Sequence, residues 1–387
     1  MRSRLRTLDS VRGIAAFAVV LHHAVMTFPG GGEQRDLLLS RGFAAPEAWL
    51  YLTPLRLAVS GPAAVLLFFV LSGFVLTKSV TSDRAPSYGA FAVSRFVRIW
   101  HPFAVAIAAS VLLSSFLADR TAPGTSAWFM LGTWHEPLTL GSVGRHLAMT
   151  GTATDLDNPM WSLVHELRIS LLFPLLVLLT LRARGLTLAA TLLMSFACIA
   201  IIGGGGLPGL VMSCLQTGTY VYFFVIGIML ATRTDEIRAR LTSWSKWAIA
   251  GLWIVALAAL TLAPPDTSHV TTFGDGALLL VSGAGAGLVI ALCVIGGAAE
   301  WLLLARVPRF LGRISYSLYL THLIVIAAVV HAFAGAVPLA AALAAALPLS
   351  LLVADLCQRF VEAPGQQLGK RLAAGVDRSR YTATALG

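Results

Sequence analysis

Charged side chains are scarce in this sequence. Only 12% of the 387 residues are Asp, Glu, Lys or Arg, whereas 57% are hydrophobic. A water-soluble protein of this length cannot bury so much apolar surface, so the composition excludes a soluble globular domain. The apolar segments are long and near-continuous rather than alternating, which excludes an outer-membrane barrel. The chain is therefore predicted to be an all-α, polytopic helical membrane protein with membrane lipid around it.

Cysteine is also rare, and the common catalytic motifs are missing. The four cysteines show no C-x-x-C spacing, so the sequence indicates neither a zinc site nor a disulfide framework, and no metal is expected. There is no Walker A motif, no glycine-rich dinucleotide fingerprint and no H-E-x-x-H. No histidine is followed by an aspartate at the spacing found in soluble and peripheral glycerolipid acyltransferases.

Apolar stretches long enough to cross a bilayer recur along the chain, and we count ten of them. With the N-terminus inside, all but six of the 28 Lys and Arg residues fall on the cytoplasmic side. This asymmetry predicts ten crossings with both termini cytoplasmic, and it explains the net charge of +10 without a nucleic-acid partner. The stretches are 11–28, 60–80, 99–118, 160–181, 186–204, 217–232, 245–263, 277–298, 311–333 and 336–358, and the six outer residues are Arg35, Arg41, Arg56, Arg120, Arg145 and Arg168.

The chain is expected to consist of a transmembrane domain over residues 1–370 followed by a short polar cytoplasmic tail over 371–387. Two outer loops, 29–59 and 119–159, are long and carry Pro, Gly and aromatic residues. A loop of this length is either a lid or acceptor-binding surface, or ordinary packing, and the sequence favours neither.

The first apolar stretch carries ionisable groups at unusual depth. On a helix, Arg12 and His23 share one face, about 16 Å apart along the axis, which places His23 near the middle of the membrane. Such a group is usually retained for function, and a neutral imidazole suits a general base. The alternative is a histidine that packs helices through a hydrogen bond, and that is our interpretation of His22, a quarter-turn away.

Two further segments suggest polar contacts inside the bundle. Arg95 and Arg98 are spaced i, i+3, so both guanidinium groups can bind one phosphate-bearing ligand, or they can anchor the helix at the cytoplasmic surface. Glu166 lies within an apolar stretch and needs a partner: an imidazole that it orients, as in catalytic triads, or a neighbouring His165 or Arg168.

Other polar residues are candidates for lining a cavity. Tyr316 and His322 lie on one face of the ninth stretch, although Ser and Tyr also hold membrane helices together. Trp161 and Ser162 precede Glu166 by one turn or slightly more, and Trp161 also fits the aromatic belt at the outer surface.

Taken in order, these segments resemble the acyltransferase 3 family of integral membrane O-acyltransferases. The matching pieces span nearly the whole chain: Leu8–His23, Phe68–Phe74, Arg95-x-x-Arg98, Trp161-Ser162-Leu163 with Glu166, Leu311–His322, and Phe360–Pro364. Two positions depart from the family pattern. The aromatic residues that usually follow the glutamate are absent over 167–171, and Ile324 stands where a proline is common.

The resemblance implies transfer of an acyl group, often acetyl, from cytoplasmic acyl-CoA to a hydroxyl of a cell-surface glycan or other small acceptor, in a bacterial inner membrane. It implies His23 as the base, Glu166 as its orienting group, and Arg95, Arg98 and Arg12 as acyl-CoA-binding residues. Acetyl-CoA is a co-substrate in this interpretation. A transporter that moves an acyl donor or anionic metabolite through the same arginine-lined cavity is the alternative.

Overall fold

The computed structural model describes residues 2–30, 53–82, 85–118, 122–264, 267–268, 270–296 and 300–385. Within these ranges the regular structure is entirely helical. Most of the first predicted outer loop lies outside the described residues, as do Arg35, Arg41, Arg84 and Arg120 of the charge analysis.

Eight helices of the described chain are long and apolar enough to cross a membrane, which confirms a polytopic helical membrane protein. Their cores are α1 (Arg2–Thr27), α4 (Gly61–Val80), α5 (Tyr88–Leu117), α8 (Met160–Gly203), α9 (Gly209–Thr232), α12 (Phe273–Ile295), α14 (Arg306–Ala332) and α15 (Leu339–Cys357). The remaining elements are η2 (Pro54–Val59), α6 (Ala127–Gly132), α7 (Leu140–Leu147), α10 (Thr234–Leu241), α11 (Lys246–Thr261), α13 (Glu300–Leu303), the π-helical turn η3 (Gln358–Glu362) and α16 (Ala363–Ala385).

Each of the ten predicted stretches overlaps one of these helices. Two of the stretches fall in α8, whose 44 residues would rise about 66 Å, roughly twice the thickness of the hydrocarbon core. Ala183 interrupts α8 with non-helical backbone angles, φ −149° and ψ 62°. The seventh stretch, 245–263, corresponds to α11, which is shorter and has 16 residues. The number of crossings and the cytoplasmic location of both termini stay predictions.

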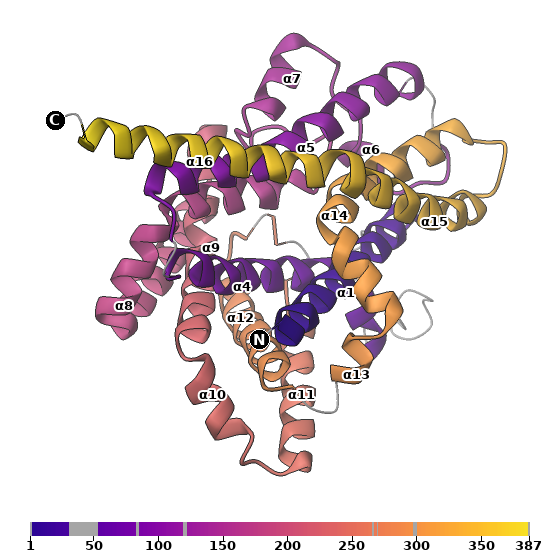
Figure 1. The fold of residues 1–387 in the computed structure, drawn as a ribbon. Coiled ribbons are helices and arrows are strands. Elements are labelled where there is room, and N and C mark those ends of the chain that lie inside the picture. Colours follow the sequence, from indigo (N-terminus) through magenta and orange to yellow (C-terminus); the bar gives the residue numbers. More distant parts are fainter. Residues whose placement is uncertain are drawn as a thin grey trace.

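The third predicted stretch extends further toward the N-terminus than its hydropathy indicates. Helix α5 begins at Tyr88, where the Ser87 hydroxyl accepts a hydrogen bond from the Ala90 N–H. The paired arginines at positions 95 and 98 therefore project from regular helix. Helix α16 lies along α5 and runs straight through residue 370, so no break in the backbone marks the predicted start of the tail (Figure 1).

Helices α1 and α14 approach each other unusually closely. A Cβ atom on Gly13 would collide with the backbone of Leu311 and Gly312, and one on Gly312 would collide with the backbone of Asp9. Glycines at such crossings let membrane helices pack backbone against backbone. The contact fixes α1 against the most buried of the long helices.

We expect Gly13→Ala to destabilise the protein by about 1–3 kcal/mol, because the added methyl group forces the two backbones apart. The matched control is Gly251→Ala in α11, where an added Cβ meets no atom within 4 Å. Thermal unfolding in detergent, followed by tryptophan fluorescence, measures both. Equal unfolding temperatures for the two variants would contradict the close crossing.

Candidate functional site

A cavity of about 520 Å³ opens among α1, α4, α5, α8, α14 and α16. It brings together predicted site residues from separate segments of the sequence: Arg12, Arg95, Arg98, Ser162, Glu166 and Tyr316. Its polar wall is formed by Arg12, Ser72, Ser79, Ser94, Arg95, Arg98, Ser162, Glu166, Ser315, Tyr316, Tyr319, Lys370 and Asp377. Trp161 does not line this cavity; its ring packs against His165 and Tyr220 instead.

Glu166 is held by Arg95. The Arg95 Nη2 atom lies 2.9 Å from Glu166 Oε1 and also donates to the Ser170 hydroxyl at 3.0 Å. The Ser72 hydroxyl donates to the same Glu166 oxygen at 2.9 Å. Within the described part of the chain, no hydrogen bond or ion pair joins the Glu166 side chain to His23, His165 or Arg168. Arg95 is 9% exposed, so this ion pair is largely shielded from water.

The basic residues that line the cavity differ in whether a neighbouring side chain pairs with them. The Arg12 Nε atom donates to the Ser315 hydroxyl at 2.8 Å, and its Nη2 atom lies 3.2 Å from Asp9. Arg98 and Lys370, by contrast, form no ion pair or hydrogen bond within the part of the chain that the structure describes, and both are exposed. An anion entering this cavity would meet these two side chains first.

Lys370 was not selected from the sequence as a site residue. It follows the last apolar stretch by twelve residues and directly precedes the predicted polar tail. Only the direction of α16, which returns along α5, brings Lys370 to the cavity.

His23 contacts His322 rather than a carboxylate. Its Nδ1 atom lies 2.7 Å from His322 Nε2, and the two rings are nearly parallel, with an angle of 4° between their planes. His322 Nδ1 lies 2.9 Å from the Leu318 carbonyl oxygen. Because a carbonyl only accepts, His322 Nδ1 carries a proton, and in the neutral ring its Nε2 must accept from His23 Nδ1–H. That arrangement leaves the lone pair of His23 Nε2 free to act as a base.

The segment that follows α5 packs against His23 of the histidine pair. The Trp128 ring in α6 stacks on His23, with centroids 5.1 Å apart. Helix α6 is tied to the end of α1, because Ser126 N donates to the Thr27 carbonyl at 2.9 Å and its hydroxyl donates to the Met26 carbonyl at 2.6 Å. His22 points elsewhere, with its Nδ1 2.9 Å from the Val59 carbonyl oxygen.

The second outer loop is packed closely where the structure describes it. The Trp134 indole N–H donates to the Ser110 hydroxyl, which donates to the Leu156 carbonyl. Asp157 is 1% exposed, and burial raises the pKa of its carboxyl well above the usual range. The burial of Asp157 is compatible with a packing role of this loop, whereas Trp128 shows that the same loop also reaches His23.

Tyr319 lies between the cavity and the histidine pair. It lines the cavity, and its ring centroid is 6.2 Å from that of His322, whereas neither histidine lines the cavity. The Tyr319 and Ser162 hydroxyls are hydrogen-bonded at 2.7 Å, and both reach the Pro159 carbonyl. Tyr316 donates to the Ile99 carbonyl at 2.9 Å. These contacts fix Tyr316, Tyr319 and Ser162 in the wall of the cavity, and Tyr319 is the one of them that lies next to His322.

Comparison with known proteins gives an independent indication of the chemistry. A family model described as an acyltransferase domain matches residues 5–359. The O-acetyltransferase PaAT-1 of Phomopsis amygdali is 24% identical over 369 residues, covering 81% of this chain and 71% of that protein. None of the solved structures matches the chain.

Proposed function

Because the chain belongs to the acyltransferase 3 family, we propose that this membrane acyltransferase moves an acetyl group from cytoplasmic acetyl-CoA to a hydroxyl of a cell-surface glycan or another small hydroxylated acceptor. The observation that supports the proposal most directly is the hydrogen-bonded histidine pair, because its member His322 lies next to Tyr319 in the wall of a cation-lined cavity. The family assignment favours an enzyme over the transporter that buried arginines alone left open. We place it in the cytoplasmic membrane of a bacterium.

The donor would enter the cavity with its phosphates at the cytoplasmic end. Arg98 and Lys370 are the cations whose charge is not already neutralised by a neighbour, and guanidinium and ammonium groups both bind phosphate oxygens well. Arg12 contributes a third positive charge. Arg95 acts differently in this proposal, because its pairing with Glu166 makes it a positioning residue that braces α5 against α8.

The pantetheine arm would then point toward Tyr319 and the histidine pair. His23 Nε2 takes the proton from the acceptor hydroxyl as the oxygen attacks the thioester carbonyl, the C–S bond breaks, and the imidazolium returns the proton to the CoA thiolate. His322 accepts the Nδ1–H hydrogen bond throughout, which holds the ring in the tautomer that the reaction needs and stabilises the transient positive charge.

The proposal is tested with purified protein in nanodiscs, [¹⁴C]acetyl-CoA and an extract of hydroxylated cell-envelope acceptors. We expect CoA release that depends on the acceptor, with the label recovered as an alkali-labile ester. Binding of acetyl-CoA without turnover on any hydroxyl acceptor would refute the proposal. Release of CoA that is independent of acceptor would show a thioesterase instead.

The phosphate assignment makes a separate prediction. Arg98→Ala and Lys370→Ala should each raise KM for acetyl-CoA about tenfold with little change in kcat, because a lost charge-assisted hydrogen bond weakens binding by that order. Arg371→Ala is the matched control on α16, since this neighbouring residue does not line the cavity. If Arg371→Ala raises KM equally, the effect is a general one of surface charge and not a binding site.

A further inference from the structure

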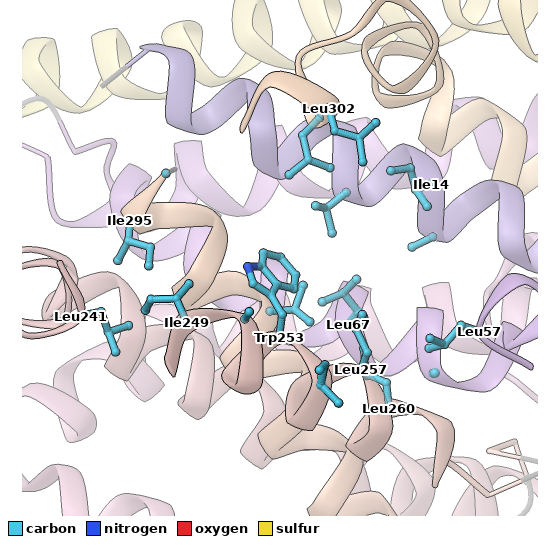
Figure 2. A pocket seen from close by; sticks show the side chains of 18 of the residues that line it. Ile14, Leu57, Leu67, Leu241, Ile249, Trp253, Leu257, Leu260, Ile295 and Leu302 are labelled. Carbon is cyan, nitrogen blue, oxygen red and sulfur yellow. The ribbon is translucent and has the colours of Figure 1, made fainter. Parts of the chain in front are cut away.

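A second cavity, of about 920 Å³, lies on the other side of α1 from the site described above. Figure 2 shows α1 along one wall, with Ile14, and α11 along the opposite wall, with Ile249, Trp253, Leu257 and Leu260. Among the described residues that line it, the polar side chains other than two tryptophan indoles are Ser60, Thr242 and Lys246. The proposed reaction makes no use of this cavity.

The cavity is elongated along α11. The lining residues of this helix run from Lys246 to Leu260 at intervals of three and four, which form one continuous stripe about 21 Å long. This exceeds half the roughly 30 Å hydrocarbon thickness. Small residues on the facing helices, Ala15 and Ala18 of α1 and Ala63 and Ala64 of α4, leave the space open. An apolar space of this size does not hold water stably, so a hydrocarbon chain is the occupant that fits it.

One end of the cavity has the composition of a membrane surface. Lys246 and Trp244 line it there. Trp247 and Trp301, which adjoin the lining residues Lys246 and Leu302 in the chain, are 87% and 74% exposed. Tryptophan and basic residues together mark the boundary between hydrocarbon and water.

The charges around this end are mainly positive. Arg238 and Arg240 on α10 are exposed, and Arg306 begins α14 three residues after the lining residue Leu303. The acidic side chains nearby are Asp235, Glu236 and Glu300; Glu236 is paired with Arg233, and the Glu300 carboxylate lies next to the lining residue Gly296. The basic residues belong to the predicted cytoplasmic set, and the cytoplasmic leaflet is the one that carries anionic lipid.

We propose that this cavity is a binding site for an anionic phospholipid of the cytoplasmic leaflet, with an acyl chain along the α11 stripe and the phosphate at Lys246. Helix α11 packs directly on α12 and η2, whereas the lining places α1 across the cavity from it. The lipid chain therefore completes the contact between α11 and the helix that carries His23. The proposal does not depend on the acyl-transfer reaction.

The site is tested by lipid binding with two pairs of variants. Delipidated protein is titrated with dioleoylphosphatidylglycerol or dioleoylphosphatidylcholine, and retained lipid is measured by native mass spectrometry and by thermal stabilisation. Ala250→Trp fills the cavity and should abolish both signals, whereas Ala248→Trp, on the same helix but outside the lining, should keep them. Lys246→Gln should weaken binding of the anionic lipid about fivefold and leave the zwitterionic one unchanged. Arg184→Gln, at the distant interruption of α8, is the charge control.

Three results would overturn the proposal. If Ala250→Trp and Ala248→Trp retain equal amounts of lipid, the cavity is not the binding site. If Ala250→Trp fails to fold, the lipid affinity of Lys246→Gln still tests the proposal. Equal affinity of Lys246→Gln and wild type for the anionic lipid would remove the head-group assignment. If palmitoyl-CoA binds at a lower concentration than the phospholipid and displaces it, the occupant of the cavity is a long-chain thioester instead.

Discussion

Replacing His23 by alanine should lower the rate of acetyl transfer by about 10²–10⁴-fold, because a positioned general base contributes a factor of that size. Replacing His322 by phenylalanine should lower it about 10²-fold, at the lower end of the same range. The phenylalanine ring keeps the packing but removes the Nε2 lone pair, so the His23 Nδ1–H loses its acceptor at 2.7 Å and the productive tautomer is no longer fixed. Initial rates at saturating acetyl-CoA measure both effects.

His322→Gln distinguishes this role from simple packing. A glutamine oxygen can reach the position of the lost ring nitrogen and accept the same proton, so we expect it to recover a substantial part of the activity that His322→Phe loses. His22→Gln is the matched control, since the Nδ1 atom of His22 is hydrogen-bonded to the Val59 carbonyl oxygen. Acetyl-CoA binding should be unchanged in all these variants. Full activity of His322→Phe would rule out the histidine pair as the catalytic unit.

Replacing Glu166 by alanine should destabilise the protein by about 3–5 kcal/mol, because removing one partner of a buried pair leaves the other charge uncompensated. The Arg95 guanidinium would keep only the Ser170 hydroxyl as a partner. Denaturation by SDS in mixed micelles, read from circular dichroism, gives the free energy of unfolding. The loss is one of folding stability, so residual activity per folded molecule should fall much less than in His23→Ala.

The Arg145–Glu136 pair supplies the control for this experiment. Its two atoms are 3.1 Å apart, close to the 2.9 Å of Arg95–Glu166, but its side chains are 50% and 43% exposed. Glu136→Ala should therefore change the unfolding free energy by less than about 1 kcal/mol. The double variant Arg95→Ala/Glu166→Ala should recover part of the loss. A large effect of Glu166→Ala on turnover with unchanged stability would instead assign Glu166 to catalysis.

The features that follow from helical periodicity could be predicted from the sequence. Arg12 and His23 were placed on one face of one helix by their spacing of eleven residues, and both face α14 in the structure. The helical class followed from composition, since few charges and long apolar stretches permit little else in a bilayer. Such predictions depend on only one helix at a time.

Contacts between helices could not be predicted in the same way. Glu166 needed a partner, but Arg95, Ser72 and His23 lie on three different helices, and only the packing of α4, α5 and α8 decides which of them it meets. The helix carrying Lys370 has an ordinary polar composition, so its return along α5 left no signal in the sequence. The role of His322 could not be predicted for a related reason, because it depends on the His23 ring that faces it.

The crossing of α1 and α14 restricts where the sequence can gain or lose residues. Gly13 lies against Gly312, and His23 lies against His322, so both contacts join residues that are 299 apart in the chain, and the two helices run in parallel. In each helix, ten residues, or about 15 Å, separate the glycine contact from the histidine contact. Inserting or deleting one residue between them in either helix would turn its histidine about 100° away from the other. Loop lengths elsewhere can drift, whereas this interval can change only in both helices at once.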